Sequence, residues 1–422
     1  MTRTHIPASL TLSLCTSLLL APLSLAPLRA QTATVRTGIE VLRDRKFDLL
    51  QGKRVGLITN PTGVDRSLQS TVDILHGESG LKLVALFGPE HGVRGDHAAG
   101  DIVGASIDSA TGIPVYSLYG ATRKPTEEML QDLDVLVYDI QDIGCRSYTY
   151  ISTMGLAMEA AADRGIPFVV LDRPNPLGGE RVEGTPVEVE YRSFVSQYAI
   201  PYVYGLTCGE LAAMLNGEGL LEGGRRCSLT VVPMEGWKRS MVFEETGQPW
   251  VPPSPHVPHS WSPLYYVATG VLGELGVVSE GVGYTLPFQV LAAEWINGQA
   301  LTDSMNALQL PGLRFRPITF VPFYGRDAGK RLHGVQVYVL DPRGSSLMAV
   351  QFRFLQVHHA LYPDKNPFLL AQPSRIEMFD KVCGTDEVRE AMVEGMKAED
   401  AFRRLEEGVQ EFKAKAAKYH LY

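Results

Sequence analysis

The sequence is poor in cysteine and, beyond its first 30 residues, has no apolar run long enough to span a membrane. Of 5 cysteines, four lie beyond residue 30: Cys145, Cys208, Cys227 and Cys383. Their spacings match neither a zinc knuckle nor a CxxC redox site. We expect buried free thiols for most of them, although an exported protein could also form disulfides.

Basic residues are also in the minority, 39 Lys and Arg against 47 Asp and Glu, for a net charge of −8. No basic run offsets this balance. An acidic chain of this kind is a poor partner for nucleic acid or for an anionic membrane surface, so neither is expected.

Several catalytic motifs are missing. No GxSxG elbow, P-loop or GxGxxG follows any predicted strand, which makes serine hydrolase and nucleotide-binding functions weak candidates. Asp96, His97 and Asp101 could suggest a metal site, but their spacing is not that of a zincin. We therefore predict neither a cofactor nor metal ligands, and a metal-dependent hydrolase stays open as an alternative.

What is present begins with an N-terminal export signal over residues 1–30. Arg3 precedes an apolar stretch from Leu10 to Leu25, and Leu28-Arg29-Ala30 provides a small-residue cleavage site before Gln31. Cys15 lacks the small preceding residue of a lipoprotein signal. The sequence predicts a periplasmic or extracellular protein with no membrane anchor after processing, and its mature form would carry a charge of −10, because removal of two arginines leaves 37 basic residues against 47 acidic ones.

Residues 35–248 alternate short apolar strands with helix-like segments, which predicts an α/β domain with a doubly wound parallel sheet. The predicted strands are 54–59, 83–87, 115–118, 135–140 and 168–171, and the predicted helices are 67–76, 126–133, 149–164 and 207–216.

The second half of the chain has a different sequence pattern. Five prolines crowd into 250–263, so 249–265 is predicted to be a rigid linker or a loop over the first domain. Residues 266–422 are predicted to form a smaller α+β domain, with strands at 334–340 and 349–357 and one helix over 398–419.

Ligands bind outside the carboxyl ends of the strands in open parallel sheets, so the residues after each strand are the candidates for a site. They are unusually polar: Asn60 after the first strand; Glu90, His91 and Arg94 after the second; Gln141, Asp142, Arg146 and Tyr148 after the fourth; Asp172, Arg173 and Asn175 after the fifth. Asp139 itself could equally be a structural hydrogen-bond acceptor.

Glu90 is the strongest catalytic candidate among them. It stands between proline and glycines, which can hold an ionisable group rigidly, and Phe87 and Pro89 could raise its proton affinity. Glu90 is therefore predicted to be a general acid, with His91 and Asp142 beside it in the catalytic group.

Four segments carry a family resemblance: Gly56–Gly63, Phe87–Gly92, Asp139–Gly144 with Tyr148–Met154, and Leu171–Pro176. With them the chain resembles the NamZ-type exo-β-N-acetylmuramidases, bacterial peptidoglycan glycosidases. The resemblance implies a Rossmann-like domain, a smaller C-terminal domain with a cleft between them, and release of N-acetylmuramic acid from the non-reducing end of peptidoglycan fragments. It maps the proposed catalytic glutamate to Glu90 and makes the other polar residues at the strand ends candidates for lining the sugar site.

The chain departs from this family in places. It has Val282 and Tyr284 where the family usually has arginine and threonine, and His256 where asparagine is common. A periplasmic muropeptide-binding protein without turnover is therefore a second hypothesis.

Two further expectations concern the chemistry. A glycosidase requires a second group, which could be Asp142, Asp172 or the acetamido group of the substrate. An arginine, Arg146 or Arg173, is expected to bind the lactyl carboxylate of muramic acid, because a guanidinium matches a carboxylate.

Overall fold

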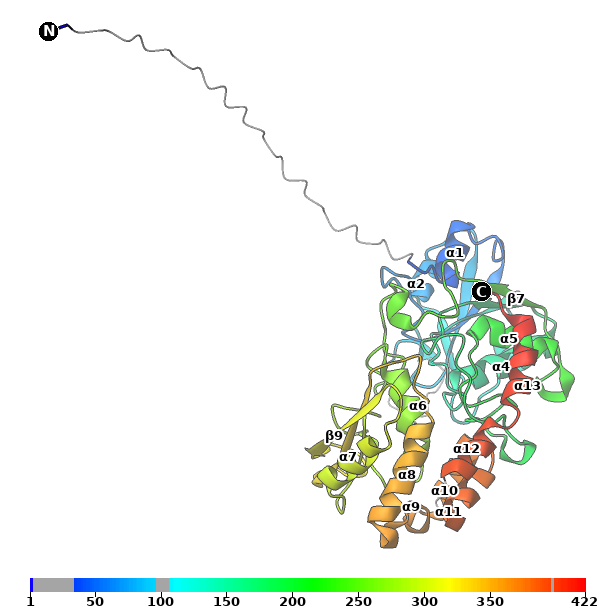
Figure 1. Cartoon of the computed structure of the whole chain (residues 1–422). Coiled ribbons are helices and arrows are strands. Elements are labelled where there is room, and N and C mark those ends of the chain that lie inside the picture. The colour runs from blue at the N-terminus through cyan, green and yellow to red at the C-terminus, as the bar shows by residue number, and fades with distance from the viewer. Residues whose placement is uncertain (3–33, 96–105, 396–397) are drawn as a thin grey trace. The chain divides into compact units, whose positions relative to one another are not determined.

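A seven-stranded sheet organises the first half of the protein (Figure 1), as seen in a computed structural model that describes residues 1–2, 34–95, 106–395 and 398–422. Its strands are β1 Arg54–Thr59, β2 Lys82–Gly88, β3 Ser106–Ile107, β4 Pro114–Ser117, β5 Val135–Asp139, β6 Phe168–Leu171 and β7 Leu229–Val232. They are ordered β3-β4-β2-β1-β5-β6-β7, and only β3 runs antiparallel to its neighbour. The six parallel strands follow the Rossmann order 3-2-1-4-5-6, which confirms the predicted fold class.

Helices cover both faces of this sheet because its strands are apolar on both sides. Val55 and Leu57 of β1 belong to one core cluster, whereas Ile58 belongs to the other. The first cluster includes residues of α1 Gly38–Asp44 and α2 Thr71–His76, and the second those of α4 Tyr150–Arg164 and α5 Cys208–Gly217. A one-turn helix, α3 Glu127–Leu130, precedes β5.

The predicted strands of this domain are all present, with small differences at their ends, but β3 and β7 were not predicted. The first predicted helix begins at Thr71 and not at Ser67. Leu68 has a left-handed φ of 64°, and the Ser70 hydroxyl caps the helix by accepting from the Asp73 amide.

A separate antiparallel sheet lies in the second half, in the order β8-β10-β9. Its strands are β8 Val290–Ala293, β9 Leu313–Phe320 and β10 Leu332–Val339. The helices are α6 Ser262–Gly273, α7 Gly298–Ala307, α8 Ala349–Leu361, α9 Pro367–Leu370, α10 Pro373–Cys383, α11 Glu387–Gly395, α12 Ala398–Glu406 and α13 Val409–Ala416. Short 3₁₀ turns occur at Val189–Tyr191, Glu222–Gly224, Phe243–Glu245, Pro363–Lys365 and Ala417–Tyr419.

Two predictions for this half were wrong. The strand predicted at 349–357 is helix α8, because Phe354, Leu355 and His358 continue a buried helical face beyond the apparent alternation. The single helix predicted over 398–419 is divided into α12 and α13 at Gly408, which has a left-handed φ of 73°.

The end of the chain returns to the first sheet. Phe412 and Ala416 of α13 join the core cluster of α4 and α5, as the red helix beside them in Figure 1 shows. Residues 33–422 form one compact unit, so the predicted domain limits stay predictions. Cys145, Cys208, Cys227 and Cys383 are buried and free, as expected for most of them.

The fully buried guanidinium of Arg146 ties four chain segments together. It donates to the carbonyls of Thr185, Ile200, Val382 and Cys383 at 2.6–2.9 Å and to the Ser196 hydroxyl at 3.2 Å. Burial lowers the pKa of Arg146 to about 10, so it remains charged at neutral pH. The expectation that Arg146 binds a substrate carboxylate is therefore corrected: its donors are occupied by backbone.

Replacing Arg146 should weaken the fold strongly. Arg146→Met keeps much of the apolar stem but leaves four buried carbonyls without their donors, so we expect a loss of about 3–5 kcal/mol in the free energy of unfolding. Urea unfolding followed by circular dichroism measures it. Arg192→Met, at an exposed position, is the matched control. A loss below about 1 kcal/mol for Arg146→Met would contradict this account.

Candidate active site

A tight turn directly after β2 presents Glu90. The Gly92 amide donates to the Pro89 carbonyl at 3.0 Å, which places Glu90 and His91 at the corners of a four-residue turn. His91 has a left-handed φ of 72°, a conformation that non-glycine residues rarely adopt and that is often found at functional sites. The strand end and the turn together fix the position of the Glu90 carboxyl.

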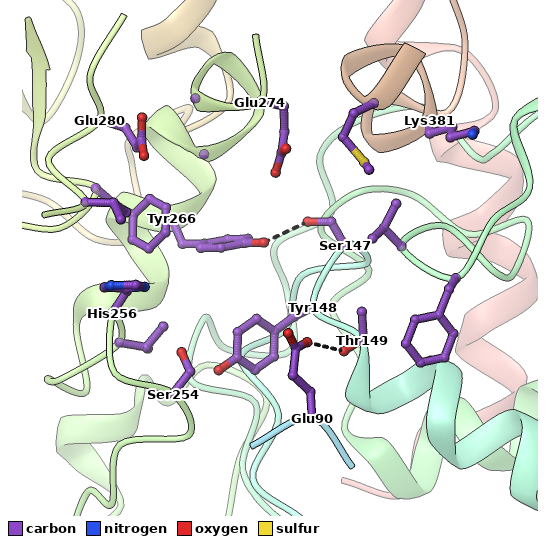
Figure 2. A pocket seen from close by; sticks show the side chains of 18 of the residues that line it. Glu90, Ser147, Tyr148, Thr149, Ser254, His256, Tyr266, Glu274, Glu280 and Lys381 are labelled. Atoms are coloured by element: carbon purple, nitrogen blue, oxygen red, sulfur yellow. Dashed lines mark hydrogen bonds between the residues drawn. The ribbon is translucent and has the colours of Figure 1, made fainter. Parts of the chain in front are cut away.

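The Glu90 carboxyl faces the start of α4. The Thr149 hydroxyl donates to Glu90 Oε2 at 3.2 Å (Figure 2), and Thr149 is the N-cap of that helix, whose positive end favours a nearby negative charge. Tyr119 lies near the same carboxylate: burial and, after it, the charge of Glu90 raise the pKa of Tyr119 to about 12. The Thr149 hydroxyl therefore orients the carboxyl.

Glu90 lies in a pocket of about 730 Å³, within the range of small-molecule sites. Rings form part of its wall: Tyr148 meets Tyr150 and Tyr266 edge-on, with centroids 4.9 and 5.9 Å apart, and Tyr266 meets Phe288 at 4.8 Å. Ser147 and Tyr266 share a hydrogen bond of 3.1 Å across the pocket (Figure 2).

The proline-rich segment also reaches this site. Ser254, His256 and Val257 line the pocket, and the Tyr150 hydroxyl donates to the Pro253 carbonyl at 2.5 Å. The segment therefore passes over the start of α4. His256 and Val282, two of the departures from the family pattern, both lie at the pocket, whereas Tyr284 packs against Phe320 and Phe323.

Carboxylates and cations gather at the part of the pocket away from Glu90. Glu274 and Glu280 lie there (Figure 2), with Arg326, Asp327, Arg375 and Lys381. Burial raises the pKa of Glu274, and it raises the pKa of Glu280 to about 7. Glu280 Oε2 accepts no hydrogen bond from any described residue.

Of the predicted site residues, Glu90, His91 and Tyr148 line this pocket. Arg94 lies elsewhere: it pairs with Asp108 at 2.9 Å and with Asp73 at 3.3 Å beside β3 and β4. These two carboxylates occupy its guanidinium, so the prediction that Arg94 lines the sugar site is corrected.

Asp142 and Asp172, the two predicted second carboxylates, are buried outside the pocket. Asp142 accepts from the Gly144 amide at 2.7 Å and from the Tyr204 hydroxyl, and Asp172 accepts from Thr207, Gly209 and Tyr422 at 2.7–2.8 Å. Both carboxylates hold loops together, so neither is placed to act on a ligand in the pocket.

The remaining candidates are structural as well. Arg173 makes a bidentate ion pair with Asp139 at 2.5 and 3.0 Å, so its guanidinium is not available for a lactyl carboxylate. Of the roles that the sequence left open for Asp139, the structure shows the structural acceptor. Asn175 and Gln141 form hydrogen bonds with nearby backbone groups, and the Asn60 side chain accepts a hydrogen bond from the Thr62 amide.

Sequence reasoning missed several residues of the pocket: Tyr119, Arg123, Phe194, Tyr266, Glu274, Glu280 and Phe288. Glu280 stands two residues before Val282, one of the positions that were compared with the family, so that comparison could have indicated it. The others lie within helices or irregular loops that carry no signal of their own.

The described residues show neither a metal site nor a membrane-spanning helix. Across 34–95, 106–395 and 398–422, no three His, Cys, Asp or Glu side chains gather as a metal site would require. Asp96, His97 and Asp101 lie outside the described residues. No described helix is long and apolar enough to cross a bilayer.

Comparisons with known proteins agree with each other. The family models "Exo-beta-N-acetylmuramidase NamZ, N-terminal" and "C-terminal" match residues 55–261 and 264–422. Peptidoglycan beta-N-acetylmuramidase NamZ of Bacillus subtilis (strain 168) is 46% identical over 393 residues, which are 93% of this chain and 92% of that protein.

Two solved structures of DUF1343 family proteins from Bacteroides fragilis NCTC 9343 are similar throughout. One is 55% identical with a TM-score of 0.89, and the other is 31% identical with a TM-score of 0.74. Each comparison covers 92% of this chain and 99% of the other chain.

The burial of Asp142 predicts a pH effect on stability. Its pKa is raised from 3.8 to about 7, so the folded state holds a proton that the unfolded state releases, and this contribution to stability is lost as the pH rises from about 4 to about 7. Asp142→Asn removes this ionisable group. As the pH rises from about 4 to about 7, the free energy of unfolding of the variant should therefore increase by about 2–4 kcal/mol relative to that of wild type.

Urea unfolding over this pH range provides the measurement, and Asp364→Asn at an exposed position is the control. A constant difference between Asp142→Asn and wild type would show that Asp142 does not titrate in this window.

Proposed function

The chain belongs to the NamZ exo-β-N-acetylmuramidase family and is a glycoside hydrolase, and from this premise we propose that it releases N-acetylmuramic acid from the non-reducing end of peptidoglycan fragments. The observation that carries the proposal is the Glu90 carboxyl, held at a turn inside a pocket with aromatic walls. A pocket of about 730 Å³ suits a terminal sugar and its neighbour better than a long glycan chain.

In the proposed reaction, Glu90 is the general acid. It donates its proton to the glycosidic oxygen as the bond to the anomeric carbon breaks, so that the leaving sugar departs as a neutral alcohol. Thr149 holds the carboxyl in position. Tyr148 and Tyr266 offer ring surfaces to the apolar face of a sugar.

The second group of the reaction has fewer candidates than the sequence allowed. Asp142 and Asp172 are buried away from the pocket, which favours a carboxyl of the pocket itself or the acetamido group of the substrate. Glu274, Glu280 and Asp327 are the carboxyls that line the pocket besides Glu90.

Glu90→Gln tests the assignment. The amide keeps the size of the side chain and its acceptor for Thr149 but has no proton to transfer, so kcat for a natural disaccharide should fall about 10²- to 10⁴-fold. A 4-nitrophenyl glycoside, whose leaving group needs little protonation, should lose much less.

Glu190→Gln, at an exposed position outside the pocket, is the matched control. Circular dichroism and thermal unfolding establish that both variants fold. If folded Glu90→Gln hydrolysed the disaccharide at near wild-type rate, Glu90 would not be the acid.

Export is part of the proposal, and it is supported by the signal-like pattern of residues 1–30. After expression in a Gram-negative host, the mature protein should be recovered outside the cytoplasm and begin at Gln31. N-terminal sequencing of the recovered protein tests this, and retention of residues 1–30 would contradict it.

A further inference from the structure

The cationic side chains of the pocket differ in whether a carboxylate of the protein already pairs with them. Arg326 lies 3.1 Å from Asp327 and 3.6 Å from Glu280, Arg375 lies 3.9 Å from Glu274, and Lys381 pairs with Glu377 at 2.5 Å. These three are therefore partly neutralised by the protein itself.

Arg123 is different. It lies on the loop between β4 and α3, is exposed, and has no carboxylate within 4.0 Å among the residues that the structure describes. Its guanidinium stacks over the Phe194 ring, 4.4 Å from the centroid. Stacking holds the plane of the group by its face and leaves the N–H donors at its edge available. The guanidinium is therefore already oriented to bind a planar anion.

Arg123 and Glu90 line the same pocket, and Tyr119 lies near both. The Tyr119 ring centroid lies 6.3 Å from that of Phe194, on which Arg123 stacks, and the pKa of Tyr119 responds to both charges. Glu90 raises the pKa of Tyr119 and Arg123 lowers it. A ligand that reaches Glu90 therefore lies within reach of Arg123.

We propose that Arg123 is the specificity-determining residue that binds the lactyl carboxylate of the terminal sugar. The inference rests on the proposed function. In N-acetylmuramic acid, the lactyl group and the scissile bond belong to one pyranose ring, so the acid and the cation must lie within one sugar of each other. Because the chain carries a net charge of −8, an anionic sugar also needs a local cation that no protein carboxylate already occupies.

Two substrates that differ only in charge test this inference. They are 4-nitrophenyl N-acetyl-β-muramide with a free lactyl carboxylate, and the same glycoside with the carboxylate capped as a methylamide. For Arg123→Ala, kcat/KM for the free acid should fall about 10- to 100-fold, mainly through KM, and the value for the methylamide should stay within about twofold. Arg123→Lys should recover part of the loss, because it restores the charge without the planar fork.

Arg192→Ala is the matched control. It removes the same charge from an exposed position two residues from Phe194 and outside the pocket, and it should leave both substrates unchanged. Raising the salt concentration should shrink the preference of the wild type for the free acid and leave that of Arg123→Ala unchanged. Equal losses on both substrates, or no loss on either, would overturn the role of Arg123.

The proposed function can fail separately. If the wild type hydrolysed neither glycoside nor a natural disaccharide, that function would be wrong. Calorimetric binding of N-acetylmuramic acid and of its methylamide would then decide on Arg123 without turnover. Weaker binding of only the free acid by Arg123→Ala would support the inference, and equal affinities in wild type and variant would overturn it.

Discussion

The buried guanidinium of Arg146 is the constraint on which the arrangement of the site depends. A charged group without a carboxylate partner is costly to bury, and here its cost is offset by four backbone carbonyls from segments as distant as Thr185 and Cys383. The next residues along the chain, Ser147 to Tyr150, provide the hydroxyls and rings around Glu90. Because Arg146 holds the base of this segment, the segment can bring a helix start and two tyrosines to the pocket without a long rigid element of its own.

The polar residues at the strand ends explain why the pocket is displaced from the usual place in a Rossmann sheet. Ligands of such sheets bind where the strand order reverses, here between β1 and β5. In this protein that position is filled from within: Asp139 holds Arg173 and Thr71, and Thr62 caps the backbone of Gln141. The pocket therefore lies farther out, at the turn after β2 and the start of α4.

The buried polar network at this position also limited what the sequence could predict. Continuous apolar strands and their punctuation were enough to predict the fold class and five strands of the sheet, and the Pro89-Glu90-His91-Gly92 segment was enough to place Glu90 among the pocket candidates, where the structure has it. A buried polar network, however, has the same composition as a binding loop, so Arg146, Asp172 and Asn175 could not be told from ligand-binding residues before their partners were known. Tyr266 and Glu274 were missed for the opposite reason: Tyr266 lies in an ordinary apolar helix and Glu274 directly follows it, and only the packing of α6 beside Ser147 brings them to the pocket.

Burial and two arginines together account for the charge distribution in the pocket. Glu274 and Glu280 would oppose an anionic ligand if both were fully ionised, but burial raises the pKa of each, to about 7 for Glu280. Near neutral pH a large fraction of Glu280 is protonated, and a protonated carboxyl both donates and accepts hydrogen bonds. Arg326 and Arg375 compensate the remaining charge. Under the proposed function, the part of the pocket away from Glu90 would meet the hydroxyl and amide groups of a sugar without repelling its carboxylate, and the choice between anionic and neutral sugars would then fall to Arg123.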